Sequence, residues 1–218
     1  MTYSLRMPVL LVLAIFICHG SLYSAIENTN EHSGNILFFG DSLTAGYGIE
    51  RNLAYPHLIS KKVESENLPY KVVASGLSGE TSAGGLRRID WVMRQPIAIL
   101  VLALGANDGL RGLDLATTES NLQAIIDKAK ERNQNLKIVI VGMQIPPNLG
   151  QDYARQFKQM YPRLAEKNDA ILIPFLLEGV AGDKNLNLSD GFHPNPEGHR
   201  IIAETVWIYL EPQLRNGG

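Results

Sequence analysis

Short apolar runs alternate with longer amphipathic stretches along this chain from about Asn35 onward. A run that is apolar at every position fits a strand buried on both faces, and apolar residues at helical spacing fit the helices that cover those faces. The pattern predicts strands at residues 36–39, 70–74, 97–104, 136–141 and 170–174. It also predicts helices, the fourth of them interrupted by Pro162, at residues 53–66, 84–93, 114–132, 153–167 and 196–210.

This order of elements predicts one α/β domain, a three-layer α/β/α sandwich around a central five-stranded parallel sheet of flavodoxin-like type. The chain has 218 residues, of which 45% are hydrophobic, and this suits a single domain with a full core. Its 20 basic and 22 acidic residues give a net charge of −2, so charge offers no reason to expect a nucleic-acid partner. Because ligands bind beyond the carboxyl ends of parallel strands, a site is expected in the segments that follow the strands.

The first 25 residues differ from the rest and predict a secretory signal peptide. Arg6 precedes an apolar run at residues 7–18, and small and polar residues follow it. A basic start, a short apolar run and a small-residue exit are typical of export signals. We expect cleavage between Gly20 and Ala25, a mature domain at residues 26–218, and a periplasmic or secreted location. The alternative is an uncleaved membrane anchor, although the run is shorter than the roughly 20 residues that a membrane span needs.

Cys18 is the only cysteine and lies inside this N-terminal segment. Residues 15–17 lack the small side chains expected before a lipid-modified cysteine, so a lipoprotein is not favoured. Once the signal is removed, the domain has no disulfide and no thiol nucleophile, and a cysteine-based mechanism is excluded.

Two segments contain residues that fit nucleophilic catalysis. Residues 40–48 follow the first strand, and Ser42 at its exit fits a helix N-cap about as well as a nucleophile. This segment is neither the G-x-S-x-G elbow of α/β-hydrolases nor a phosphate-binding P-loop. Residues 189–195 hold Asp190 and His193 three positions apart, so one short turn can set the carboxylate beside the imidazole. A plain surface turn is the alternative there.

Two further segments offer hydrogen-bond donors. Asn107, after the third strand, has a side-chain amide that could face a developing oxyanion. Gly79, after the second strand, lets the backbone approach a ligand closely and present its N–H. The alternatives are an Asx turn for the first and a plain loop for the second.

Together and in this order, the four segments resemble the SGNH (GDSL) hydrolase superfamily. The likeness covers nearly the whole mature chain and points to the bacterial periplasmic thioesterase, lysophospholipase and arylesterase group. Ala106 and residues 74–75 depart from the common pattern, but neither change removes a functional side chain. The similar motifs are GDSLTAGYG at residues 40–48, GETS at 79–82, LGANDGLRG at 104–112, MQIPPN at 143–148 and DGFHPN at 190–195.

The resemblance implies a serine hydrolase that cleaves carboxylic esters or thioesters through an acyl-enzyme. It makes Ser42 the nucleophile, His193 the base, and Asp190 the residue that orients His193. The backbone N–H groups of Ser42 and Gly79, with the side-chain amide of Asn107, would form the oxyanion hole. No metal and no cofactor are expected.

Other residues receive less direct roles. Residues 109–113 are expected to border the acyl groove, although a simple loop is an equal alternative. Asp41 is expected to be structural and to fix the nucleophile turn. His57 and His199 lie on predicted helices, where packing or a surface position is favoured over catalysis. The substrate contacts implied by the resemblance are Leu110, Arg111 and Pro146.

The expected partners are small acyl esters, thioesters or lysophospholipids, including substrates drawn from membrane lipids, and the expected state is a monomer. One alternative is a carbohydrate acetylesterase of the same superfamily. Another is a non-catalytic lipid-binding protein that has kept the fold, against which the intact set of Ser42, Asp190 and His193 argues. A nucleotide-binding protein lacks support because the sequence has no Gly-rich phosphate fingerprint.

Overall fold

Five parallel strands form the sheet in the computed structural model, which describes residues 1–2 and 34–215. The predicted signal peptide and Cys18 therefore lie outside the described residues. The strand order is β2-β1-β3-β4-β5, and each neighbouring pair is parallel. The strands are β1 (Gly34–Gly40), β2 (Tyr70–Gly76), β3 (Ile97–Ala103), β4 (Lys137–Val141) and β5 (Ile171–Ile173).

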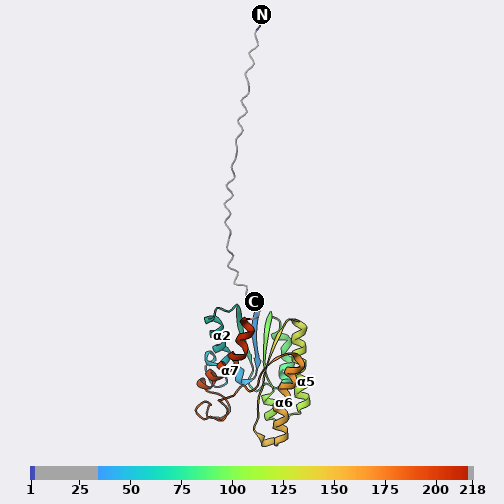
Figure 1. Ribbon diagram of the computed structural model, residues 1–218, viewed down its shortest axis with the longest axis vertical. Coiled ribbons are helices and arrows are strands. Elements are labelled where there is room, and N and C mark those ends of the chain that lie inside the picture. The colour runs from blue at the N-terminus through green and yellow to red at the C-terminus, as the bar shows by residue number, and fades with distance from the viewer. Residues whose placement is uncertain (3–33, 216–218) are drawn as a thin grey trace. The chain divides into compact units, whose positions relative to one another are not determined.

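Helices cover both faces of this sheet (Figure 1). On one face, α2 (Tyr55–Ser65) packs beside α7 (Pro196–Arg215). On the other face, α5 (Leu115–Arg132) packs against α3 (Ser82–Val92) and against α6 (Gln151–Asn168). The predicted three-layer α/β/α fold is confirmed. Four short helices complete the domain: α1 (Ser42–Ala45), η1 (Arg51–Leu53), α4 (Ala106–Leu110) and η2 (Pro147–Leu149).

The apolar runs that predicted the strands form the centre of the core. Every side chain from Ile36 to Phe39 in β1 is fully buried, and most of β3 is buried as well. Each such side chain contributes about 1.5–3 kcal/mol through removal from water, which explains why these strands lie in the middle of the sheet. Among the residues described, no helix is both long and apolar enough to cross a membrane.

Two helices run further than the sequence predicted. Pro162 was expected to interrupt a helix, but α6 continues through it. The last helix was expected to end at residue 210, but α7 continues through Pro212 to Arg215. A proline inside a helix removes one backbone hydrogen bond, and packing on the sheet outweighs that loss in both cases. The buried side chains of α6 are Phe157, Met160, Tyr161, Leu164 and Ala165.

The strand order creates a crevice at the carboxyl ends of β1 and β3. The chain leaves β1 toward β2 on one side and returns to β3 on the other, and ligands bind at such a switch point in open α/β sheets. Gly40 and Ala103, the last residues of β1 and β3, are paired in register. Ser42 and Asn107 follow these two strands closely, so the fold brings their segments to the same edge of the sheet.

Candidate active site

Ser42 is the first residue of α1, which begins directly after β1. The cap of this helix is Asp41, whose Oδ1 accepts a hydrogen bond from the Leu43 backbone N–H at 3.0 Å. The alternative assignment of Ser42 as the N-cap is therefore not what the structure shows, and its hydroxyl takes no part in capping. Asp41 has the expected structural contact with the turn.

Two glycines allow α1 to lie this close to the sheet. A Cβ on Gly40 would lie 2.1 Å from Thr44 Oγ1, and a Cβ on Gly76 would lie 2.2 Å from the Ala45 backbone nitrogen. Any larger residue at either position would push α1 outward. Glycine at the ends of β1 and β2 therefore helps to set the position of Ser42.

His193 lies between Ser42 and Asp190. Its Nε2 is 3.0 Å from Ser42 Oγ, and its Nδ1 is 2.7 Å from Asp190 Oδ2. The other carboxylate oxygen of Asp190 accepts from the backbone N–H groups of His193 and Phe192, at 3.0 and 2.9 Å. These hydrogen bonds, with that from the His193 backbone the largest, lower the pKa of Asp190 to about 2. An ionised Asp190 can only accept, so His193 Nδ1 donates its N–H to Asp190, and the lone pair of Nε2 then faces the serine hydroxyl.

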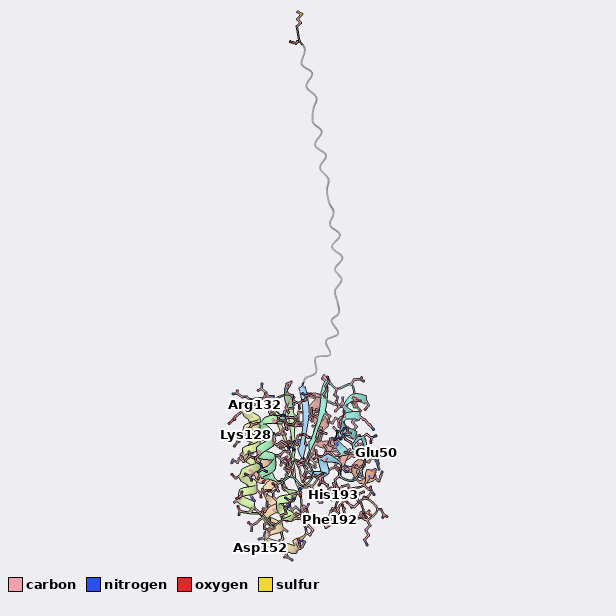
Figure 2. The ribbon with its side chains drawn as sticks, turned by 180° about the vertical axis from the view of Figure 1, so that it is seen from behind. Glu50, Lys128, Arg132, Asp152, Phe192 and His193 are labelled. Atoms are coloured by element: carbon pink, nitrogen blue, oxygen red, sulfur yellow. The ribbon has the colours of Figure 1, made fainter. Side chains whose placement is uncertain are left out.

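Tyr47 covers one face of the His193 ring, a contact that the sequence analysis did not identify. The two ring centroids are 4.5 Å apart, and the planes are tilted by 40°. The Tyr47 backbone N–H also donates to the Ser42 carbonyl at 3.0 Å. Figure 2 shows Phe192 and His193 at the end of the domain where Asp152 lies, opposite the end marked by Arg132.

Asn107 and Gly79 come from segments that meet beside α1. Asn107 lies on α4, a short helix where a loop was expected, and its Nδ2 is 3.4 Å from Asp41 Oδ2. Its Oδ1 is 3.4 Å from Nη2 of Arg111, and the same nitrogen donates to the Gly79 carbonyl at 3.1 Å. Gly79 has φ +77°, a left-handed conformation that glycine adopts without strain.

Asp41 is a buried carboxyl group beside Ser42, with 2% of its surface exposed. Burial raises its pKa from 3.8 to about 6, and the hydrogen bond from Leu43 and the charge of His193 only partly offset this effect. A carboxylate held in such surroundings needs donors around it. The amide of Asn107 is one of these donors.

Behind these segments, Asp108 joins α4 to the beginning of α3. Its two carboxylate oxygens accept from the Ser82 hydroxyl at 2.6 Å and the Ser82 backbone N–H at 2.8 Å, and Asp108 is 2% exposed. Sequence reasoning missed this contact, because an acidic residue after Asn107 and a serine at a helix start are each too common to indicate a pair.

Arg88 of α3 makes a second buried contact that the sequence did not reveal. It forms an ion pair with Glu80, and its Nη2 donates to the Ser75 carbonyl at 3.0 Å. Its guanidinium lies 4.3 Å from the centroid of the Phe39 ring. Ser75 and Glu80 flank the loop that contains Gly79, so Arg88 binds both ends of this loop.

The remaining predicted residues have other surroundings. Leu110 and Pro146 are exposed, and their role as substrate contacts stays a prediction. His199 is buried, and its Nδ1 accepts from the Tyr55 backbone N–H at 3.2 Å, which is the predicted packing role. His57 is half-buried on α2. In the described part of the chain, no group of three or more His, Cys, Asp or Glu side chains is placed to hold a metal ion.

Residues 38–201 match the model of the GDSL-like lipase/acylhydrolase family, a span that includes all of the site residues above. The chain belongs to this family. The resemblance to SGNH (GDSL) hydrolases that the motifs predicted is confirmed, and with it the hydrolase class.

Curated relatives of this acylhydrolase have ester and thioester hydrolase names. It is 37% identical to esterase TesA of Pseudomonas aeruginosa over 180 residues, 82% of this chain and 89% of that protein. It is 35% identical to an arylesterase of Vibrio mimicus over 198 residues, 90% of this chain and 94% of that protein. It is 36% identical to thioesterase 1/protease 1/lysophospholipase L1 of Escherichia coli K12 over 183 residues, 83% of this chain and 85% of that protein.

A solved structure agrees with these similarities. The acylhydrolase superposes on the psychrotrophic esterase EstA from Pseudoalteromonas sp. with a TM-score of 0.78 and 30% identity, covering 84% of this chain and 99% of that one. The chain is therefore an SGNH-type hydrolase of the esterase and thioesterase class.

Proposed function

We propose that this acylhydrolase cleaves carboxylic esters and thioesters with Ser42 as nucleophile, His193 as base and Asp190 as the residue that orients the imidazole. The observation that supports this is the continuous connection from Asp190 to His193 at 2.7 Å and on to Ser42 at 3.0 Å. A serine hydroxyl is a weak nucleophile until a base of fixed tautomer takes its proton. The contact with Asp190 fixes the tautomer of His193, and the contact with Ser42 puts this base within reach of the hydroxyl proton.

The reaction proceeds in two half-reactions. Ser42 Oγ attacks the acyl carbonyl while His193 Nε2 takes the hydroxyl proton, and Asp190 stabilises the resulting imidazolium. His193 then gives that proton to the leaving alcohol or thiol, and the acyl group stays on Ser42. A water molecule repeats the sequence, which releases the carboxylic acid and restores the serine.

The oxyanion that forms in each half-reaction needs donors in fixed positions. We assign this role to the backbone N–H groups of Ser42 and Gly79 and to Nδ2 of Asn107. Neither backbone N–H has an acceptor among the described residues, so both are available to a substrate. Removal of one such donor lowers turnover by about 10²–10³-fold in serine hydrolases.

The assignment of Ser42 is tested by Ser42→Ala, with p-nitrophenyl butyrate hydrolysis as the measurement. We expect loss of nearly all turnover with an unchanged circular dichroism spectrum and melting temperature, because the hydroxyl takes no part in capping α1. Ser120→Ala removes an exposed hydroxyl from α5 and is the matched control, with full activity expected. Substantial activity in folded Ser42→Ala would contradict the proposal.

Substrates with an apolar acyl chain fit the surroundings of Ser42. Leu77, Leu110 and Leu149 follow β2, β3 and β4, so they lie at the same edge of the sheet as Ser42, and all three are about half exposed. A series of acetyl, octanoyl and palmitoyl substrates, each as a matched oxygen ester and thioester, measures the preferred length and leaving group. A strict preference for acetyl esters would instead favour a carbohydrate deacetylase.

We also propose export through residues 1–25, with cleavage between Gly20 and Ala25. The supporting observation is the short apolar run at residues 7–18, which follows Arg6 and ends in small residues. N-terminal sequencing of the protein from the periplasm or medium of an expressing cell tests this. An intact Met1 on the membrane-bound protein would show an anchor instead.

A further inference from the structure

Arg111 contacts two of the three groups assigned to the oxyanion hole. A single guanidinium nitrogen, Nη2, donates to the Gly79 carbonyl at 3.1 Å and lies 3.4 Å from Asn107 Oδ1. Gly79 follows β2 and Asn107 lies on α4, so this nitrogen joins two segments that are far apart in the sequence. Among the described residues, no carboxylate forms an ion pair with Arg111.

The charges beside Asn107 decide which way its amide points. Arg111 has only donors and stands beside Oδ1, whereas the Asp41 carboxylate has only acceptors and stands beside Nδ2. The flipped amide would set oxygen against the carboxylate and NH₂ against the guanidinium, and both contacts would be repulsive. Arg111 and Asp41 thus select the same orientation, in which the donor group of Asn107 lies on the side of α1.

The contact with Gly79 restricts a residue that is otherwise free to rotate. Glycine in a left-handed turn has more accessible backbone conformations than any other residue, so the direction of its N–H is poorly defined unless the turn is held. The neighbouring backbone is held by hydrogen bonds from Leu77 N–H to the Gly40 carbonyl at 2.9 Å and from Glu80 N–H to the Leu77 carbonyl at 3.1 Å. The hydrogen bond from Arg111 to the Gly79 carbonyl restrains Gly79 itself.

We propose that Arg111 is a positioning residue that holds Gly79 and Asn107 in the geometry of the oxyanion hole, and that it does not bind the substrate. This inference rests on the proposed function, since it concerns the donors of that reaction. It replaces the sequence-based expectation that Arg111 contacts the substrate. Lysine cannot substitute fully, because its ammonium is a point charge without the planar donor arrangement of a guanidinium.

The test compares Arg111→Met and Arg111→Lys with the wild type on p-nitrophenyl butyrate. Misplacement of catalytic groups by about 1 Å can cost about 10²-fold, so for Arg111→Met we expect kcat to fall by about 10–100-fold while KM stays within about twofold. Arg111→Lys is expected to recover only part of the loss. Arg155→Met, at an exposed arginine that pairs with Asp152, is the matched control with unchanged kcat. An increased KM with unchanged kcat would show that Arg111 binds substrate and would overturn the proposal.

A second measurement separates positioning from a general structural effect. In the Asn107→Ala background, Arg111→Met should lower kcat by a smaller factor than in the wild type, because one of the two groups that Arg111 holds is already gone. An equal factor in both backgrounds would overturn the proposal. Melting temperatures of the variants are expected to match the wild type, since Arg111 is exposed. Failure of the proposed function would appear differently, as activity that survives in Ser42→Ala.

Discussion

Asp41→Asn should make the protein more stable at neutral pH and at the same time slow the reaction. Burial raises the pKa of Asp41 from 3.8 to about 6, so the folded state binds its proton more tightly than the unfolded state does. The free energy of unfolding therefore loses nothing to this group below about pH 4, where Asp41 is protonated. It falls as the pH rises from about 4 through about 6, where Asp41 ionises in the folded state. With 1.36 kcal/mol for each pH unit, the ionised carboxylate costs the folded protein about 3 kcal/mol above pH 6.

Asparagine removes this charge and keeps the cap, because Asn and Asp are about equally favourable at the N-cap of a helix. Its new NH₂ group, however, can face the Asn107 amide nitrogen, and a poorly paired buried amide costs about 1 kcal/mol. The variant should then exceed the wild type by about 2 kcal/mol at pH 8, which is about 4–8 °C in melting temperature for a domain of this size. Near pH 4, where the folded wild type has a protonated Asp41, only the cost of the amide remains, and the variant should be less stable than the wild type by about 1 kcal/mol.

The same substitution removes the acceptor that fixes Asn107, so kcat should fall by about tenfold even though the fold is more stable. Thermal unfolding followed by circular dichroism from pH 4 to 8, together with kcat on p-nitrophenyl butyrate, measures both effects. Asp127→Asn, at an exposed carboxylate on α5, is the control for charge alone. A stability gain of the same size at pH 4 and pH 8, or a loss at pH 8, would refute the reasoning.

Two further predictions concern the packing behind the site. Arg88→Met leaves the Glu80 side chain, which is 3% exposed, as an unpaired buried charge, so urea unfolding should show a loss of about 3 kcal/mol that Glu80→Gln in the same protein largely restores. Without that restoration, the ion pair would not be the cause. Gly85→Ala adds a carbon 2.4 Å from Leu104 Cδ1 and should cost about 1–3 kcal/mol in the same assay. Gly84→Ala, whose added carbon comes no closer than 3.0 Å to the Glu80 side chain, is its control and should cost less.

The sheet could be predicted from the sequence because its central strands are apolar at every position. Residues 36–39 and 97–104 can be buried on both faces only in the middle of a parallel sheet, and the structure places them there. Helix ends were less predictable. The sequence marks Pro162 as a break, but the side chains that hold α6 together across it contact partners from other elements.

The candidate site could be predicted only in part, for a related reason. Ser42, Asn107 and His193 follow strands or precede a helix, so local pattern and family motifs point to them. The two contacts of Arg111 join segments 32 and 4 residues away from it, and no local signal marks such a link. The burial of Asp41 likewise depends on elements that are distant in the sequence.

The contact between Ser42 and His193 spans 151 residues, from the first strand of the domain to the turn before its last helix. If β1 and α1 form before the rest of the domain, the proposed nucleophile is in place, but the proposed base reaches it only when the C-terminal turn has docked. The proposed catalytic contact thus requires both ends of the domain to be folded. The proposed triad is therefore absent from an unfolded chain, which would not hydrolyse acyl lipids or thioesters before it folds.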